Sequence, residues 1–252
     1  MEWKTLLATT RLSDKDSNHR NEFDDDYKRS VTSPAFRRLQ DKTQVFPLER
    51  LDFIHTRLTH SLEVAMIART LVSEIVRLLQ QDSLTETDSS KQEMIYHQSD
   101  IARIVECASL LHDIGNPPYG HFGEDIIRQW FKKKLPQILA EHSDVAEEFL
   151  ASPYVHDFYH FEGNAQSLRI VSKLHDFKGN FDGLDLTPAT INTILKYTRA
   201  SNQPKTEKIT SKKVGFFRAE EDIFRQITAI TGTGENRHPL TFILEAADDI
   251  AY

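Results

Sequence analysis

Apolar residues recur every three or four positions along most of the chain, a spacing typical of amphipathic helices packed on a core. A first run starts at Ser61 and predicts a helix of about twenty residues. Its apolar positions are Leu62, Val64, Ile67, Leu71, Ile75 and Leu78. A second run leads into His112, with Asp100 as its predicted N-cap. Its apolar positions are Ile101, Ile104, Val105, Ala108, Leu110 and Leu111.

The remaining chain continues this helical pattern. Further helices are predicted near residues 123–134, 136–151, 163–175, 187–198, 219–230 and 240–252. Thr187 and Pro188 suit the N-cap and first position of one of them. The polar stretch Gln81–Gln98 is predicted to be a mobile linker, and the basic segment Arg199–Lys213 an exposed loop. Strand-like alternation is limited to Thr43–Phe46, so the predicted fold class is all-α.

Composition narrows the class of protein. A chain of 252 residues can bury a substantial core, and 39% hydrophobic with 27% charged residues is ordinary for a globular protein. The net charge of −7 argues against a surface that coats nucleic acid, although it is compatible with a small anionic substrate. No apolar run approaches the ~18 residues of a membrane span. The single cysteine, Cys107, cannot form an internal disulfide, which predicts a cytoplasmic location.

The strongest candidate for chemistry is the stretch Leu110–Glu124. His112 and Asp113 place an imidazole beside a carboxylate, a ligand pair suited to a divalent cation. The glycine and prolines that follow end the helix and turn the chain, and His121 and Glu124 come next. Those two side chains are of the type that moves protons beside a bound cation, so the sequence indicates metal-assisted hydrolysis.

Two other regions offer further ligands. His60 lies at the start of the first long helix, and Asp248 and Asp249 lie on an otherwise apolar helix near residue 250. Carboxylates are costly to bury on such a helix unless they are paired, and a bound cation is one reason to place them there. The dipeptide His-Asp also occurs at residues 156–157 and 175–176. Neither copy is followed by the turn and the second histidine, so both are predicted to be structural.

Six motifs in order give a resemblance to a known family. They are SPAFRRLQDKTQVFP (Ser33–Pro47), TRLTHSLEV (Thr56–Val64), LLHDIGNPPYGHFGE (Leu110–Glu124), HFEGNAQ (His160–Gln166), LKYTR (Leu195–Arg199) and EAADDIAY (Glu245–Tyr252). Between Ser33 and Tyr252 the chain resembles the deoxyguanosinetriphosphate triphosphohydrolase family of the HD-domain superfamily. The resemblance implies an all-α HD-domain helical bundle with a metal site between its helices.

The resemblance also implies roles for individual residues. The four metal ligands would be His60, His112, Asp113 and Asp248, and the catalytic pair His121 and Glu124. Asp248 is preferred over Asp249 because Tyr252 then falls four residues on, where the family places a tyrosine against the deoxyribose. The residues implied to bind the substrate are Gln44 and Val45 at the base and sugar, Tyr252 at the sugar, and Arg57, Asn164, Lys196, Tyr197 and Lys213 at the phosphates.

The family activity is cleavage of a deoxynucleoside triphosphate, with dGTP favoured, into deoxynucleoside and tripolyphosphate. A divalent metal, Mn²⁺ or Mg²⁺, is the implied cofactor, and Co²⁺ or Fe²⁺ fit the same ligands. The resemblance further implies a homo-oligomer of the full-length protein, a single-stranded DNA effector and no membrane partner. Residues 1–32 are predicted to form an N-terminal segment and residues 33–252 the HD-domain core. That core is expected to be truncated at its C-terminus relative to the family.

Two other functions stay open from the residues alone. One is a different HD phosphohydrolase that cleaves monophosphates or phosphodiesters. The other is a non-catalytic module that binds a nucleotide or single-stranded DNA, suggested by the basic loop. His121 can act either as a base toward water or as an acid toward the departing oxygen.

Overall fold

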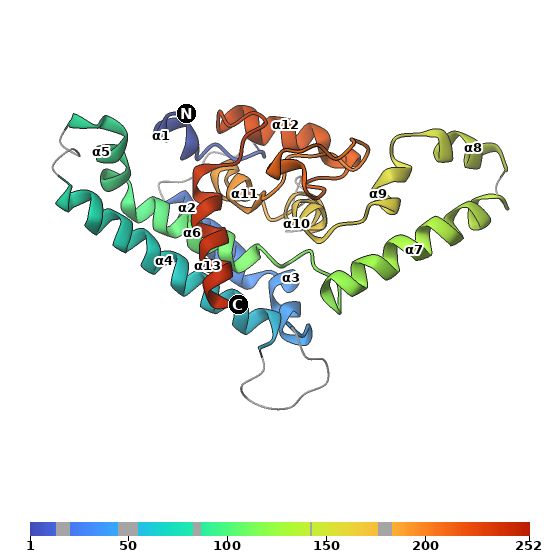
Figure 1. The fold of residues 1–252 in the computed structure, drawn as a ribbon, viewed down its shortest axis with the longest axis horizontal. Coiled ribbons are helices and arrows are strands. Elements are labelled where there is room, and N and C mark those ends of the chain that lie inside the picture. Colours follow the sequence, from blue (N-terminus) through green and yellow to red (C-terminus); the bar gives the residue numbers. More distant parts are fainter. Residues whose placement is uncertain (14–20, 45–54, 83–86, 142, 176–182) are drawn as a thin grey trace.

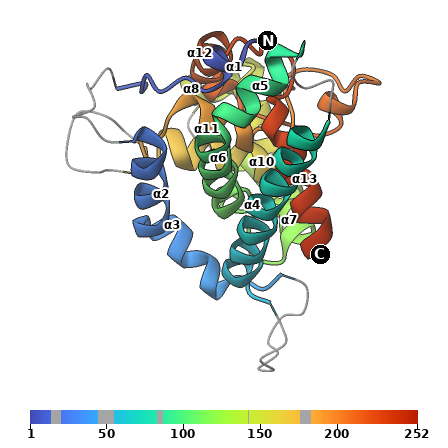
Figure 2. The same ribbon diagram turned by 90° about the vertical axis from the view of Figure 1, so that its left-hand side faces the viewer.

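Helix α6 (Gln98–Leu111) lies at the centre of the molecule, and nearly every residue of its second half is buried. It contacts α2 (Glu22–Thr32), α4 (Arg57–Gln81), α11 (Pro188–Ile194) and α13 (Pro239–Ala251). Figure 2 shows α6 enclosed by α4, α11 and α13. A helix that is apolar on almost all sides is stable only when other helices cover it. The apolar run that ends at His112 is therefore the core of the bundle.

The computed structural model describes residues 1–13, 21–44, 55–82, 87–141, 143–175 and 183–252. The described elements are helices, joined by two isolated β-bridges, Thr43–Thr56 and Ala200–Phe216, so the all-α prediction is confirmed. The helices not yet named are α1 (Trp3–Leu6), α3 (Pro34–Arg37), η1 (Arg38–Asp41), α5 (Ser89–Tyr96), α7 (Gly120–Leu139), α8 (Ser143–Ala151), α9 (Val155–Tyr159), α10 (Gly163–Ser172), η3 (Ile209–Ser211), η4 (Arg218–Glu220) and α12 (Glu221–Ile230). In the described part of the chain, no helix combines the length and apolarity needed to cross a bilayer.

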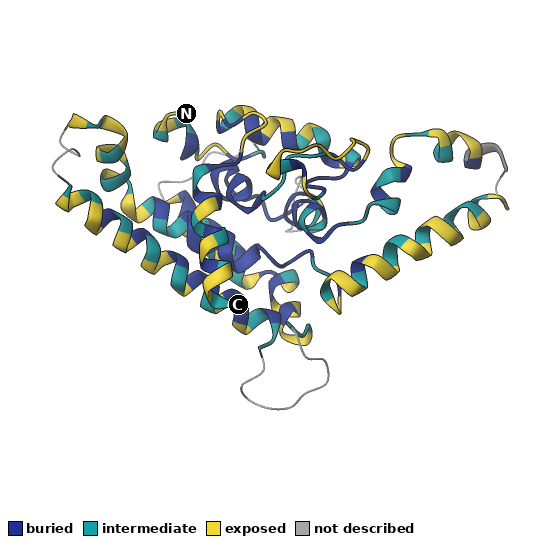
Figure 3. Ribbon diagram, viewed as in Figure 1, coloured by how far each residue is buried: buried dark blue, intermediate teal, exposed yellow. Residues whose placement is uncertain are grey.

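Helix α7 leaves the bundle, and α8 and α9 lead the chain back toward α10 (Figure 1). Most residues of α7 are exposed or only partly buried, in contrast to those of α6 (Figure 3). Glu124 is its one buried residue, and it lies in the first two turns. The start of α7 is therefore the part that belongs to the core, and this start carries His121.

Several predicted element boundaries were wrong. The stretch Gln81–Gln98, predicted to be a linker, contains α5, which Asp88 caps by accepting hydrogen bonds from the backbone of its first turn. Asp100 is not the N-cap of α6, because the helix starts at Gln98 and Asp100 lies in its first turn. The predicted helix break before Pro136 is absent, because Pro136 lies in the last turn of α7.

The helix that starts at Thr187 is confirmed but is shorter than predicted. The Thr187 side chain accepts a hydrogen bond from the Thr190 backbone, and Pro188 occupies the first turn. Leu195 already has an extended backbone, so α11 ends at Ile194 rather than near residue 198. Residues 196–199 are thus outside the helix instead of forming its last turn.

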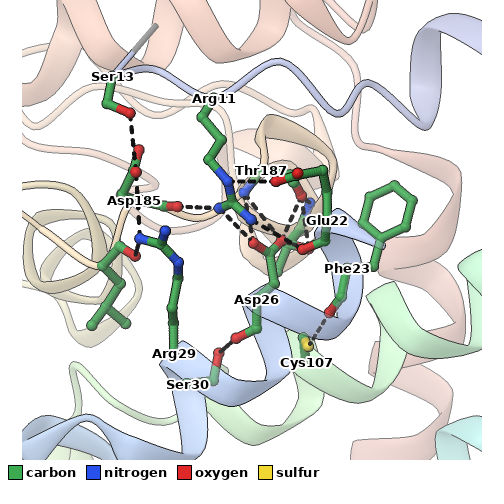
Figure 4. A network of polar contacts seen from close by, with 12 residues as sticks. Arg11, Ser13, Glu22, Phe23, Asp26, Arg29, Ser30, Cys107, Asp185 and Thr187 are labelled. Atoms are coloured by element: carbon green, nitrogen blue, oxygen red, sulfur yellow. Dashed lines mark hydrogen bonds and ion pairs between the residues drawn. The ribbon is translucent and has the colours of Figure 1, made fainter. Parts of the chain in front are cut away.

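A buried ionic network ties the N-terminal residues to the bundle (Figure 4). The Arg11 guanidinium lies 2.6 Å from Glu22 Oε2 and 2.9 Å from Asp26 Oδ1. Asp26 also accepts hydrogen bonds from the hydroxyl groups of Thr187 and Thr190, at the start of α11. Burial raises the pKa of Asp26, although Arg11 opposes this shift. Residues before Ser33 therefore contribute to the core, and the division of the chain at residue 33 stays a prediction.

The start of α13 depends on a buried, neutral histidine. His238 Nδ1 accepts a hydrogen bond from Leu240 N at 3.2 Å and serves as the N-cap, while Nε2–H donates to Leu6 O at 3.1 Å. Only the neutral ring can accept at one nitrogen and donate at the other. Burial lowers the pKa of His238 to about 4.

We predict that this histidine makes folding sensitive to mild acid. The unfolded chain takes up a proton near pH 6.5, while the folded chain resists protonation until about pH 4. Stability is therefore full above pH 6.5 and is lost as the pH falls, by about 2 kcal/mol at pH 5. Urea unfolding at pH 7 and pH 5 measures this loss. His238→Asn keeps a capping oxygen but cannot titrate, so its stability should change less over this interval. An equal change in both proteins would contradict the assignment.

Candidate functional site

A cavity of about 500 Å³ lies where α4, the turn after α6, α10 and α13 meet. It gathers most of the predicted site residues from distant parts of the sequence. The predicted residues that line it are Gln44, Arg57, His112, Asp113, His121, Asn164, Lys196, Tyr197, Lys213, Asp248 and Tyr252. His60 and Glu124 lie behind this lining and contact Asp248 and His121, respectively. Val45 lies outside the described residues.

Three of the four predicted metal ligands form one tight cluster. His60, His112 and Asp248 each offer one ligand atom, and these atoms lie within 4.8 Å of one another. His60 Nε2 is 3.0 Å from Asp248 Oδ1, and His112 Nε2 is 3.4 Å from the same oxygen. The two imidazole rings meet edge to face. The cluster joins α4, the end of α6 and α13, which supports the predicted convergence.

Helical periodicity explains why these side chains meet. His60 follows the buried face of α4, together with Val64 and Ala68. Asp248 lies four residues after Leu244 on the buried side of α13, whereas Asp249 is exposed. The choice of Asp248 over Asp249 thus agrees with the geometry of this helix.

His112 is oriented by its own helix. Its Nδ1 lies 2.7 Å from Ser109 O, so Nδ1 carries the proton and donates it to that carbonyl. In the neutral ring the Nε2 atom is the acceptor, and it is buried without a hydrogen-bond partner among the described residues. Burial lowers the pKa of His112, but nearby Asp113 and Asp248 outweigh this and raise it, so the carboxylates favour a positive charge at this nitrogen. A buried nitrogen lone pair of this kind is costly unless a cation or a donor reaches it. Ligating histidines are commonly held in this way by a hydrogen bond at the other nitrogen.

Asp113 lies beside the cluster but has other partners. Its Oδ2 forms an ion pair with buried Arg57, and its Oδ1 accepts a hydrogen bond from Asn116 Nδ2 at 2.6 Å. The same Oδ1 is 3.5 Å from His112 Nε2. Burial alone would raise the pKa of Asp113, but His112 and Arg57 outweigh it, so the carboxyl is held ionised. Asp113 therefore adds a negative charge at the edge of the cluster.

Asp248 is also held in its charged form. Burial would raise its pKa, yet contacts with His112 and His60, and the charge of Lys196, lower it far below the ordinary range. Lys196 Nζ lies 2.7 Å from Asp248 Oδ2, the oxygen that faces away from His60. Two imidazoles, two ionised carboxylates and an unpartnered buried nitrogen form a mixed N/O set. These residues fit a divalent cation.

The turn between α6 and α7 brings a second histidine to the same cavity. Tyr119 and Gly120 both adopt left-handed backbone angles, with φ of 65° and 52°. This conformation is uncommon for a tyrosine, and strained residues of this kind gather at functional sites. The turn starts α7 at Gly120, and His121 follows at once with an exposed side chain that lines the cavity.

His121 and Glu124 form a hydrogen-bonded pair. His121 Nδ1 lies 2.9 Å from Glu124 Oε2, one helical turn away, and Glu124 is almost fully buried. Arg128 Nη2 donates to the same carboxylate oxygen, and the backbone N–H of Gly163 donates to the other at 2.7 Å. Glu124 is thus fixed by Arg128 and Gly163 and orients the exposed His121 ring through Nδ1, while Nε2 is left for the cavity.

Gly163 allows the start of α10 to approach the side chains of Asn116 and Glu124 closely. A Cβ atom at Gly163 would lie 2.0 Å from Asn116 Oδ1 and 3.0 Å from Glu124 Oε1. Any larger residue would displace the amide that supports Asp113 or the carboxylate that supports His121. The start of α10 therefore joins the two halves of the site through a backbone contact.

The predicted phosphate-binding residues surround these groups. Lys213 Nζ is 3.4 Å from His121 Nε2, and Asn164 Nδ2 donates to Glu162 at 3.1 Å. Tyr197 lies under the guanidinium of Arg237, and burial raises the pKa of the Tyr197 hydroxyl.

Gln44, predicted to contact the base and sugar, has an Oε1 atom that is buried without a hydrogen-bond partner among the described residues, which leaves an acceptor for a ligand.

Sequence reasoning missed several residues of the site. Asn116 and Tyr119 line the cavity, and Lys42 donates to the Asn116 carbonyl at 2.8 Å. Glu162 contacts Arg128 and Lys213, and its pKa is raised by burial and by nearby Glu124. These residues all lie inside the motifs named above, so their position next to predicted ligands was the available signal.

Comparisons with known proteins agree with the family resemblance seen in the sequence motifs. A profile described as the HD domain matches residues 57–251. The chain is 47% identical over 258 residues to a deoxyguanosinetriphosphate triphosphohydrolase-like protein of Listeria monocytogenes, covering 100% of this chain and 54% of the relative. It is 40% identical to a protein of the same description from Pseudomonas aeruginosa, with 100% and 55% covered. It is 41% identical to a deoxyguanosinetriphosphate triphosphohydrolase of Serratia proteamaculans, with 92% and 48% covered. The chain spans about half the length of these relatives.

Adjacent aspartates on α13 provide a matched test of the cation site. Asp248→Asn removes the carboxylate that contacts both imidazoles, whereas Asp249→Asn removes an exposed charge. Loss of supporting residues around a metal already weakens binding by about 10–100-fold, so loss of Asp248 should cost at least the upper value. Titration of the metal-free protein with Mn²⁺, followed by calorimetry, measures the change. Equal Mn²⁺ affinity in the two variants would refute the role of Asp248.

Proposed function

Since this chain belongs to the HD domain family, we propose that it is a metal-dependent triphosphohydrolase that converts deoxynucleoside triphosphates, dGTP above all, into deoxynucleoside and tripolyphosphate. One observation carries the proposal. The cluster of His60, His112 and Asp248 adjoins a cavity that also holds His121 and several cationic side chains. In this proposal, residues 33–252 form the catalytic core.

In the proposed site, His60, His112, Asp113 and Asp248 hold one divalent ion, Mn²⁺ or Mg²⁺, with Co²⁺ and Fe²⁺ as alternatives. Such an ion polarises a phosphoryl oxygen and stabilises charge that develops during attack at phosphorus. His112 presents Nε2 because Ser109 fixes its tautomer. Asp113 is held ionised by Arg57, which keeps its carboxylate suited to a cation.

The cationic residues bind the phosphate chain. A nucleoside triphosphate carries about four negative charges, so hydrolysis requires both binding of a polyanion and stabilisation of further charge. Arg57, Lys196 and Lys213 all line the cavity and come from three distant segments of the chain. Arg57 forms an ion pair with Asp113, and Lys196 forms one with Asp248. The amide of Asn164 and the hydroxyl of Tyr197 add neutral donors.

His121 moves the proton. The buried Glu124 carboxylate accepts the Nδ1–H and so fixes the ring, which leaves Nε2 to exchange a proton with a reacting oxygen in the cavity. That oxygen belongs either to the attacking water or to the departing 5′ group. Lys213, 3.4 Å from Nε2, places a positive charge where the phosphate chain would lie.

We assign the nucleoside end of the substrate to Gln44, Val45 and Tyr252. Gln44, with its free amide oxygen, would contact the base and sugar, and Val45 next to it is proposed for the same subsite. Tyr252 lines the cavity four residues after Asp248. A tyrosine ring against the sugar leaves no room for a 2′-hydroxyl, which would favour deoxyribose by exclusion. The homo-oligomer, the single-stranded DNA effector and the cytoplasmic location stay predictions.

Product analysis tests the proposed function. Each of the four deoxynucleoside triphosphates is incubated with the protein and Mn²⁺ or Mg²⁺ in ¹⁸O-labelled water, and products are resolved by anion exchange. We expect deoxynucleoside and tripolyphosphate, with the label in tripolyphosphate because water attacks the α-phosphorus. Orthophosphate as the product would favour a different HD phosphohydrolase. Tight nucleotide binding without any hydrolysis would favour a regulatory module.

The role of His121 gives a second prediction. His121→Ala should lower kcat by about 10²–10⁴-fold, because proton transfer to the reacting oxygen is lost. Mn²⁺ binding should persist, since His121 is not part of the ligand cluster. His97→Ala is the control, because His97 pairs with Asp100 at the start of α6, outside the cavity lining. Near-normal kcat in the His121 variant would rule out the acid–base assignment.

A further inference from the structure

A second cavity, of about 600 Å³, adjoins the proposed catalytic cavity. His121 and Lys213 line both, so these two side chains form a shared wall. The second cavity lies between α7 and the basic segment Arg199–Lys213, of which the proposed reaction uses Lys213 alone. Its volume lies within the ~300–1,000 Å³ range of pockets that bind small molecules.

The basic segment was predicted to be an exposed loop. In the structure, internal hydrogen bonds also give it a defined fold. Arg199 Nε donates to Ser211 O at 3.0 Å, and its Nη1 donates to Gln203 O at 2.9 Å. Thr206 N donates to the buried Ser211 hydroxyl. These bonds fold the segment back on its own start. They hold Lys205 and Lys212 on the lining of the second cavity.

The acidic groups of this cavity are neutralised locally. Arg128 contacts Glu124, Asp125 and Glu162, and Lys213 lies 3.5 Å from Glu162. In the part of the chain that the structure describes, Lys132, Lys205 and Lys212 form no ion pair, although each lines the cavity. Three unpaired, exposed ammonium groups thus border one open cavity in a protein whose net charge is −7.

We propose that this second cavity binds an inorganic oligophosphate, namely the tripolyphosphate released on the other side of the His121–Lys213 wall. The inference rests on the proposed function, which supplies this product. Lysines bind phosphates as point charges without selecting a base or sugar. Apart from His121, the aromatic rings that line the cavity are those of Tyr159 and His160, and His160 is fixed by a hydrogen bond to Ser201 O. The lining therefore suits a phosphate chain better than a nucleoside.

A triple variant isolates the three unpaired lysines from the proposed catalytic residues. In Lys132→Ala/Lys205→Ala/Lys212→Ala the lining loses three charges, while His121 and Lys213 are kept. The matched control is Lys133→Ala/Lys134→Ala/Lys208→Ala, which removes three exposed lysines of α7 and the basic segment from outside this cavity. Inorganic tripolyphosphate is titrated into each metal-free protein in EDTA, and the dissociation constant is measured by calorimetry. Thermal unfolding confirms that both variants fold.

We expect the first variant to bind tripolyphosphate about tenfold more weakly than the wild type, and the control to bind it normally. The difference should shrink at high salt, which screens exposed charges. A dGTP analogue that cannot be cleaved at the α-phosphorus should bind all three proteins equally. Equal binding of tripolyphosphate by all three proteins would overturn the inference.

Two further results would also overturn the assignment to a released product. One is an equal loss of affinity for the dGTP analogue, which would place the phosphates of bound substrate in this cavity. The other is a single-stranded oligodeoxynucleotide that binds more tightly than tripolyphosphate and loses that affinity in the first variant. The titration involves no turnover, so it stands apart from the proposed function. A protein that hydrolyses no dNTP but shows the expected difference keeps the oligophosphate site and loses the proposed reaction.

Discussion

The site depends on the packing of α4 and α13 against the buried helix α6, which brings two imidazoles and one carboxylate into contact. His60, His112 and Asp248 come from α4, α6 and α13, and the packing of α4 and α13 on α6 brings them together. Polar groups at such a junction cost stability unless they are paired, and the His112 Nε2 atom has no partner among the described residues. Apolar side chains of similar size would pack there at lower cost. The polar cluster is therefore best explained by a ligand rather than by folding.

The turn after α6 couples this cluster to the rest of the site. Asp113 and Asn116 lie on one side of the turn, and Glu124 lies on the other. Gly163, at the start of α10, contacts both sides through its backbone. A displacement of α10 would therefore move the carboxylate that holds His121 and the amide that holds Asp113 together. The proposed acid–base group and the proposed ligands share one support.

Residues that depend on helical periodicity could be predicted from the sequence. The spacing of apolar residues predicted the long helix that has His60 at its start. The choice of Asp248 over Asp249 came from the family resemblance, which places a tyrosine four residues on, at Tyr252. Periodicity carries no information about partners, so contacts between distant segments outside the ligand set implied by the resemblance could not be predicted. The Arg57–Asp113 ion pair is one example, since Arg57 was assigned to phosphate alone. Helix α5 was missed for a local reason: it buries no residue, so its sequence lacks an apolar face.

Net charge was a poor guide to the surroundings of the site. The chain carries −7 overall, yet cationic side chains gather around the turn that bears His121. Acidic residues there share cationic partners, since Arg128 contacts Glu124, Asp125 and Glu162, and Lys213 also contacts Glu162. Lys132, Lys205 and Lys212 form no ion pair among the described residues. Clefts with walls of low dielectric concentrate such a local field. A polyanion would therefore meet an attractive potential at this face, while the protein as a whole stays acidic.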